Sequence, residues 1–281
     1  YLFFKQGSEE NAQYYTVKST STRSVAFFGT ATYSYQRRYM LSGTVRYEGT
    51  NKLGRSTSAR WLPTWNISGA WNAHEEKFCQ TLEPTLSNFT LKASYLLTAD
   101  RGPADVSNSL VIIQSYNPWR PFTNVKESGL LLKDVENSAL TYEKKHELNI
   151  GAEIGFIDNR INFAIDWYKR DNYDLIGLVN SAGTGVKITK FANVASMQSH
   201  GVELTLSTKN IRTKDFSWNT DFILSHAKNE VTDLQSNARV IEMITGTGFT
   251  MAGYPVRSLF SIDFQGLNEY GLPTFINENG D

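Results

Sequence analysis

Residues 25–47 read VAFFGTATYSYQRRYMLSGTVRY, and this stretch decides the fold of the chain. On the first arm every second residue is apolar or small, and the residues between them are mostly polar. After two arginines the alternation resumes on a second arm. Successive side chains of a strand point to opposite faces, so the stretch predicts a hairpin with one apolar and one polar face. Each arm has about ten residues, the length of a tilted strand that crosses a bilayer.

The composition excludes several classes of protein. The chain has 281 residues, 40% of them hydrophobic, and 28 basic residues balance 28 acidic ones. This neutral balance argues against a nucleic-acid partner. No apolar run approaches the roughly 20 residues that a membrane helix needs. The single cysteine, Cys79, excludes an internal disulfide framework and a cysteine-based zinc site. The mean hydropathy of −0.37 still allows a β-barrel, because barrels hide their hydrophobic residues in alternation.

The same alternation recurs along the rest of the chain. Strand candidates cover residues 65–71, 89–98, 146–156, 161–167, 202–207 and 216–225, with weaker ones at 259–266 and 273–276. Tight turns are expected at 37–38, 158–160 and 210–215, and long connections at 48–62, 99–145, 171–199 and 228–256. The segment 72–88 lies on the tight-turn side but is longer, and residues 74–86 could hold a short helix. Tight turns at one rim and long loops at the other are typical of outer-membrane barrels.

A soluble antiparallel sandwich is the main structural alternative, because its strands also alternate. Sandwich strands usually have five or six residues, whereas these have nearer ten. Charged residues also occur in mid-strand on the polar face, which suits a hydrated lumen but also the outside of a soluble sheet.

Several motifs resemble SusC/RagA-type TonB-dependent transporters. They are RYEGTNKLG (46–54), WLPTWNISGAW (61–71), LKASY (91–95), LTYEK (140–144), NIGAEIGF (149–156), 159–176, HGVEL (200–204), DFSW (215–218) and GYPV (253–256). Together they cover about 230 residues in the family's order and spacing. The family's S-S-R-F-G is Thr50-Asn51-Lys52-Leu53-Gly54 here, followed by a longer loop. Because loops select the cargo, this departure concerns cargo choice.

The resemblance implies an all-β fold, a segment of a 22-stranded antiparallel transmembrane barrel in the outer membrane of a Gram-negative bacterium. Residues 1–281 would all belong to the barrel domain, in its middle-to-late part, and we expect the chain to be an internal piece without the plug domain or the final strands. The implied function is active import of oligosaccharides or oligopeptides, without enzyme activity. The implied partners are TonB, acting through the plug, a SusD-like surface lipoprotein and outer-membrane lipid. A passive porin and a soluble carbohydrate-binding module are the alternatives.

Two sets of residues are candidates for function. In the loop 99–145, aromatic, amide and guanidinium side chains could contact cargo, namely Tyr116, Asn117, Trp119, Arg120 and Phe122. Packing within the loop or against the lipoprotein is the alternative role. Charged residues on the polar face are predicted to face the lumen, namely Arg46, Glu48, Lys92, Glu153 and Asp166.

No cofactor or catalytic site is expected. The four histidines are far apart in the sequence and show no metal-ligand spacing, and no G-x-S-x-G motif occurs. Asp100 and Asp105 with nearby carbonyls could bind calcium in a surface loop, although their spacing does not match an EF-hand.

Overall fold

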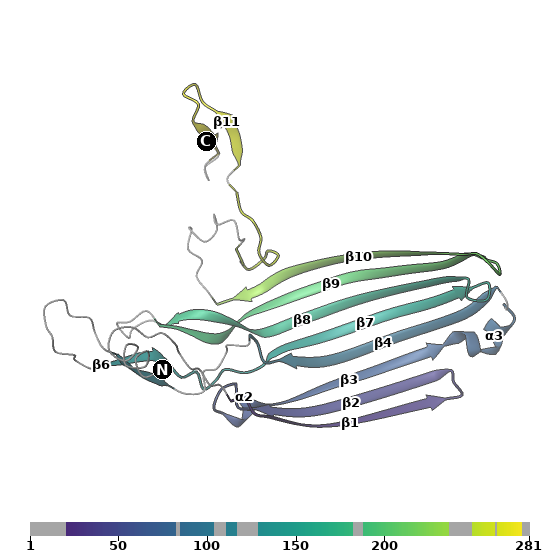
Figure 1. Cartoon of the computed structure of the whole chain (residues 1–281), viewed down its shortest axis with the longest axis horizontal. Helices are drawn as coiled ribbons and strands as arrows, with labels where there is room; N and C mark the ends of the chain where they lie inside the picture. Colours follow the sequence, from purple (N-terminus) through teal and green to yellow (C-terminus); the bar gives the residue numbers. More distant parts are fainter. Residues whose placement is uncertain are drawn as a thin grey trace, which may run out of the picture.

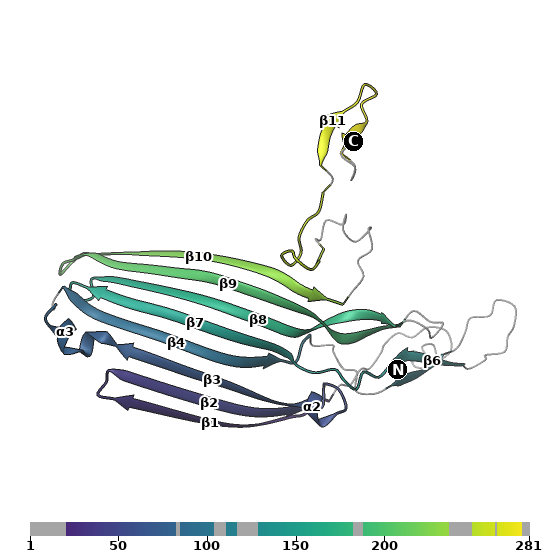
Figure 2. The same ribbon diagram turned by 180° about the vertical axis from the view of Figure 1, so that it is seen from behind.

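The fold is a single curved layer of long antiparallel strands. The computed structural model describes residues 21–82, 85–103, 111–116, 129–181, 188–235, 249–261 and 263–276. Eight strands form one sheet in the order β1-β2-β3-β4-β7-β8-β9-β10 (Figures 1 and 2). Their bounds are β1 (Ser24–Tyr35), β2 (Tyr39–Thr50), β3 (Trp61–Asn72), β4 (Leu86–Asp100), β7 (Glu143–Phe156), β8 (Ile161–Ser181), β9 (Ile188–Arg212) and β10 (Ser217–Leu234).

Smaller elements lie between and after these strands. Strands β5 (Ile112–Tyr116) and β6 (Gly129–Asp134) pair with each other, as do β11 (Phe264–Leu267) and β12 (Pro273–Phe275). The helices of the described residues are short, namely α2 (Thr57–Arg60), the 3-10 helix η1 (Ala73–Glu75) and α3 (Lys77–Gln80). Within the described segments, no helix has the length and apolar character needed to cross a membrane.

The β1–β2 hairpin forms as its sequence predicts, with a turn one residue earlier than expected. Every residue of β1 has a partner in β2, from Ser24 with Thr50 to Tyr35 with Tyr39. The two central turn residues, Gln36 and Arg37, have φ angles of 50° and 57°. Positive φ at both central positions matches the right-handed twist of the strands, and here the turn forms without the glycine that usually favours it.

The register carries the alternation across the whole sheet. On one face, Leu91 lies beside Ala152, which lies beside Ile165, and this apolar row continues on β9 and β10 to Leu204 and Leu224. We call this the apolar face. The residues that alternate with these point to the opposite side of the sheet, which we call the polar face. Its members include Thr44, Ser68, Lys92, Asn149, Asp166 and Glu203.

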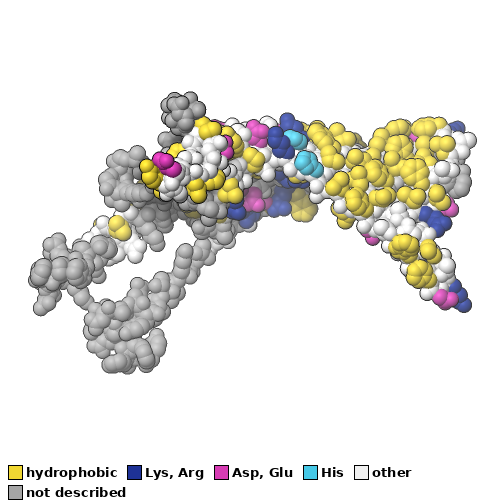
Figure 3. Space-filling model, turned by 90° about the horizontal axis from the view of Figure 1, so that it is seen from above, with side chains coloured by type: hydrophobic (Ala, Val, Ile, Leu, Met, Phe, Trp, Pro, Cys, Tyr) yellow, Lys and Arg dark blue, Asp and Glu magenta, His cyan; other side chains and the backbone are white. Residues whose placement is uncertain are grey.

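The apolar face is exposed, as a membrane-facing surface would be. Phe27, Val45 and Phe222 have 64%, 59% and 53% of their surface accessible. Figure 3 shows hydrophobic side chains gathered over the end of the sheet nearer the tight turns, and His, Lys and Arg side chains at their border. Monomeric soluble proteins rarely expose such contiguous apolar surface.

The prediction of a long connection at residues 171–199 is wrong for most of that range. Strands β8 and β9 continue through it and pair from Leu175 with Ala195 to Ser181 with Ile188. The register shifts between Asn172 and Leu175, and Asp174 between them has a φ of 57°. This irregularity breaks the period of two, so the aliphatic residues beyond it no longer continue the alternation of the first half of β8.

The other long connections are also shorter or more structured than expected. The 48–62 connection contains α2, the 99–145 connection contains the β5–β6 hairpin, and β10 extends to Leu234 within the 228–256 connection. The short helix predicted within 74–86 is confirmed by α3. Near it the Tyr39 hydroxyl donates to Glu76 at 2.8 Å, and this bond holds the pKa of the Glu76 carboxyl below its ordinary range.

A small buried core lies at the long-connection end of the sheet. Leu53, Leu140 and Tyr142 form a cluster in which the two leucines have no accessible surface and Tyr142 has 3%. The Gly54 and Arg55 amides donate to the carbonyls of Leu140 and Ser138. These contacts fasten the β2–β3 connection to the segment before β7, and we call the assembly the rim core.

Candidate functional site

The centre of the polar face holds a three-residue ion cluster. The Lys92 Nζ on β4 lies 3.0 Å from an oxygen of Glu153 on β7 and 3.2 Å from an oxygen of Asp166 on β8. All three residues were predicted to share this face, and the structure brings them into direct contact. The cluster carries one excess negative charge in a partly exposed setting.

Gly151 makes this cluster possible. It lies on β7 between Lys92 and Asp166, in register with both. A Cβ at this position would lie 2.3 Å from the Asp166 Oδ1 and 2.5 Å from the Lys92 Cε. The absent side chain therefore leaves the space in which the lysine reaches across β7.

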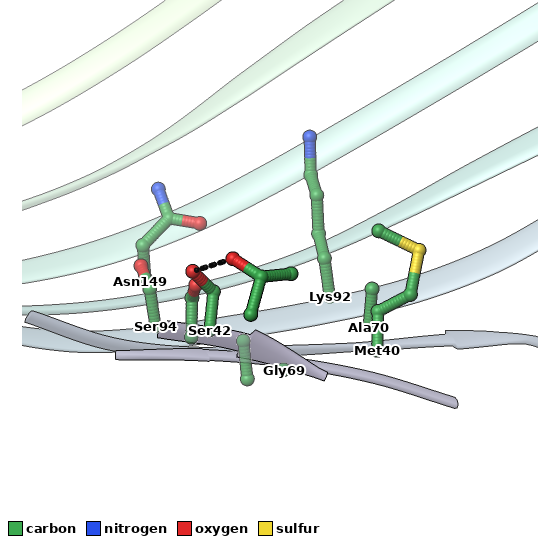
Figure 4. A pocket seen from close by; sticks show the side chains of 10 residues that line it. Met40, Ser42, Gly69, Ala70, Lys92, Ser94 and Asn149 are labelled. Carbon is green, nitrogen blue, oxygen red and sulfur yellow. Dashed lines mark hydrogen bonds between the residues drawn. The ribbon is translucent and has the colours of Figure 1, made fainter. Parts of the chain in front are cut away.

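A shallow cavity of about 280 Å³ lies beside the cluster. Figure 4 shows Lys92, Ser94 and Asn149 pointing to the same side of the sheet from neighbouring strands. Ser42 forms a 3.0 Å hydrogen bond with the hydroxyl of Thr32 in the same lining. Hydroxyl, amide and ammonium groups in an open hollow can bind water or polar cargo.

A second cavity, of about 310 Å³, lies nearer the rim core. Arg46 and Arg101 both donate to Glu48, one to each carboxylate oxygen. Tyr142 also lines this cavity, and burial raises the pKa of its phenol. Its hydroxyl donates to the Arg60 carbonyl at 3.1 Å, so it anchors the β2–β3 connection.

A further charged group lies on the polar faces of β7 and β8. Glu147 accepts from Lys145 at 2.8 Å and lies 3.0 Å from the Arg170 guanidinium. Arg170 in turn covers the ring of Tyr168 at 3.9 Å. That ring occupies the space above Gly201, where a Cβ would lie 2.6 Å from the Tyr168 hydroxyl oxygen.

The structure describes some of the residues that were predicted to have a function, and others lie outside the described ranges. The structure places Arg46 with Glu48, and Lys92 with Glu153 and Asp166, on one face of the sheet. Tyr116 ends β5. The other candidates for cargo contact, Asn117, Trp119, Arg120 and Phe122, and the calcium candidate Asp105, lie outside the described residues. No group of three His, Cys, Asp or Glu side chains is placed to hold a metal ion in the described ranges.

Sequence reasoning missed Arg101, Tyr142 and Gly151. Arg101 and Tyr142 lie in a segment that was interpreted as a loop, where alternation gives no direction. Gly151 could have been found, because it is the glycine on the polar face between Asn149 and Glu153. A glycine beside charged neighbours in a strand often marks a close approach of other groups.

Long antiparallel strands with an exposed apolar face and a charged, hydrated face define the class of transmembrane β-barrels. The chain belongs to the family described as "TonB dependent receptor-like, beta-barrel", whose model matches residues 4–266. The predicted fold class is therefore confirmed.

Relatives agree with the SusC/RagA type. The TonB-dependent receptor SusC of Bacteroides thetaiotaomicron is 28% identical over 222 residues, covering 78% of this chain and 22% of that protein. The TonB-dependent receptor P26 of Formosa agariphila is 27% identical, covering 91% of this chain and 27% of that protein. The chain therefore spans only about a quarter of the length of these curated relatives.

Solved structures show the same fold. A structure described as the RagAB peptide transporter superposes with a TM-score of 0.75 at 22% identity, covering 89% of this chain and 26% of that chain. A structure of the RagAB peptide importer in its "open-open" state also superposes with a TM-score of 0.75. The identity is 21%, and the match covers 94% of this chain and 30% of that chain. The sheet described above therefore corresponds to part of a larger barrel.

Proposed function

We propose that the complete protein imports oligosaccharides or oligopeptides actively across the outer membrane of a Gram-negative bacterium. The family match over residues 4–266 is the observation that carries this proposal. The proposed energy source is TonB, acting on a plug domain of the complete protein. The role requires no covalent chemistry.

The polar face supports a transport role in physical terms. Its ion clusters at Lys92 and Glu147 and the cavities described above give a charged, polar wall. A polar cargo passing such a wall exchanges hydrogen bonds with water for hydrogen bonds with serine, asparagine and arginine groups. We propose that Arg46, Glu48, Lys92, Glu153 and Asp166 face the lumen.

The partners follow from the same proposal. A SusD-like surface lipoprotein would cover the mouth of the barrel at the long-connection end. The connection that carries Tyr116, Asn117, Trp119, Arg120 and Phe122 would contact cargo or this lipoprotein. The RagAB relatives are described as peptide transporters, which favours oligopeptides as the first cargo to test.

Uptake measurements test the proposal. Deleting the complete gene is expected to abolish accumulation of labelled oligopeptides or oligosaccharides, and a plasmid copy should restore it. A protonophore should reduce uptake to the level of the deletion strain, because TonB depends on the proton-motive force. Uptake that persists in the protonophore would indicate the passive porin instead, and no change after deletion would contradict import altogether.

A further inference from the structure

The cavity of about 310 Å³ near the rim core carries an excess of positive charge. Among the described residues, the charged side chains that line it are Arg46, Glu48 and Arg101. One carboxylate therefore lies against two guanidinium groups, whereas the cluster at Lys92 has two carboxylates around one ammonium group. We call this space the arginine cavity.

Other charged side chains of this rim do not cancel the excess. Asp100 and Glu143, which line a neighbouring cavity, each accept a backbone amide, at 2.9 and 2.8 Å. Lys52 and Arg60 donate to backbone carbonyls, at 2.7 Å each. Together with the residues of the arginine cavity, these make four basic and three acidic side chains, so the balance stays positive.

The segment that carries Arg101 is fixed on both sides. A Cβ on Gly102 would lie 2.7 Å from the Ile176 Cδ1, so the backbone packs directly on β8, and Gly102 has a φ of 68°. The next carbonyl, that of Pro103, accepts from the Lys52 side chain. Arg46 is held independently, by its place on β2. The two guanidinium groups are therefore positioned before any cargo arrives, which lowers the entropy cost of binding.

The rest of the lining suits a small polar group with an aliphatic stem. Thr64 on β3 and Thr98 on β4 contribute hydroxyl groups, and Leu62 and Ala99 contribute apolar surface. The Tyr142 ring closes the side toward the rim core. The volume lies near the lower end of the usual range for ligand sites, so the space fits one end of a chain better than a whole oligomer.

We propose that the arginine cavity binds the C-terminal carboxylate of an oligopeptide cargo. This inference rests on the proposed import and deepens it, because it names the group of the cargo that is recognised. A guanidinium group has five N–H donors in a planar fork, and Glu48 uses only some of those that Arg46 and Arg101 offer. Carboxylates form their strongest hydrogen bonds with such ions. Every linear peptide has this terminal group, so one site serves peptides of different sequence.

The test is binding of fluorescent oligopeptide pools to the purified complete protein in detergent, measured by anisotropy. One pool lacks Asp and Glu and has free C-terminal carboxylates. A second is the same pool as C-terminal amides, and a third consists of amides that contain Glu. The variant is Arg101→Gln. The matched control is Arg212→Gln, which removes the same charge at the tight-turn end of β9.

The carboxylate pool is expected to bind the wild type about tenfold more tightly than the amide pool, the effect of one charge-assisted hydrogen bond. Arg101→Gln should weaken binding of the carboxylate pool about tenfold and leave that of the amide pool unchanged. Arg212→Gln should bind both pools as the wild type does.

A second substitution should act in the opposite direction. Glu48→Gln removes the carboxylate that competes for both guanidinium groups. The carboxylate pool should then bind about fivefold more tightly, the effect of one unit charge at close range in water. A cavity that had merely lost its structure would bind more weakly in both variants, so this gain separates recognition from misfolding.

The remaining outcomes are distinct for the inference and for import. Equal binding of the carboxylate and amide pools, or an unchanged preference in Arg101→Gln, would overturn the inference and leave import to the uptake measurement. If binding of the amides that contain Glu also depended on Arg101, the chain end would be overturned as the source of the carboxylate. Absence of binding by every pool would overturn both the inference and oligopeptides as cargo, whereas uptake of oligosaccharides would still decide on import.

Discussion

At the scale of single residues, glycines decide which groups can meet. At Gly151 a side chain would collide with the ends of flexible side chains, which can move aside. At Gly54 it would lie 2.3 Å from the Ser138 carbonyl oxygen and 2.7 Å from that of Leu140, and backbone cannot move so easily. At Gly29, an added Cβ would have no neighbouring atom within 4 Å. The three positions should therefore respond very differently to the same added methyl group.

We expect Gly54→Ala to destabilise the rim core, because the new Cβ must push the segment before β7 away. The loss should be about 1–3 kcal/mol, the usual effect of overpacking. Hydrogen exchange of the Gly54 and Arg55 amides, which donate to that segment, should accelerate in the complete protein. Gly29→Ala is the control and should leave exchange at the rim unchanged. Equal effects of the two substitutions would contradict the packing argument.

At the scale of the element, each strand presents two surfaces to two different environments. The apolar and polar faces differ by a shift of one residue, so neighbouring positions of one strand should differ sharply in their access to water. The irregularity at Asp174 shows how this rule fails when the period is broken.

Cysteine labelling checks the orientation of the strands in the complete protein. Single cysteines at Val45, Leu91 and Ile165 should be shielded by lipid from a charged thiol reagent. Cysteines at the polar-face positions Thr44, Lys92 and Asp166 should react with it. Cys79 is replaced by serine as background. Protection of the polar set and labelling of the apolar set would reverse the assignment of the faces.

At the scale of the whole molecule, the described sheet has free edges. Strands β1 and β10 are the first and last of the eight, and each has only one neighbour in the sheet. Long strand edges pair readily with other strands. Because β1 and β10 are not paired with each other in the described sheet, further strands would have to lie between them to close a barrel, which agrees with relatives of which this chain covers 22% and 27%.

Residues 1–281 expressed alone should therefore require detergent to stay dispersed. The exposed apolar face and the two free edges favour association in water. Size-exclusion chromatography with and without detergent measures this, with a soluble domain of similar mass as the control. A folded, monomeric product in plain buffer would contradict the membrane assignment and favour a soluble module.

The sequence by itself predicted the eight strands of the sheet and their two faces, except for the parts of β8 and β9 that lie within 171–199. Alternation is a local property, because it depends only on the backbone geometry of neighbouring residues. The segment 25–47 was therefore sufficient for the first hairpin, and the charged residues Lys92, Glu153 and Asp166 were assigned correctly to one face. The turn predicted at residues 37–38 differs by one position from the observed central turn residues, Gln36 and Arg37.

Only the tertiary structure decided what these residues contact. The rim core joins Leu53 to Leu140, and the ion cluster joins Lys92 to Asp166 across Gly151. Lys169, His200 and Lys228 likewise lie side by side only because β8, β9 and β10 pair in one register. Such contacts link residues far apart in the chain, and their geometry depends on register and bulges, which periodicity within one strand cannot specify.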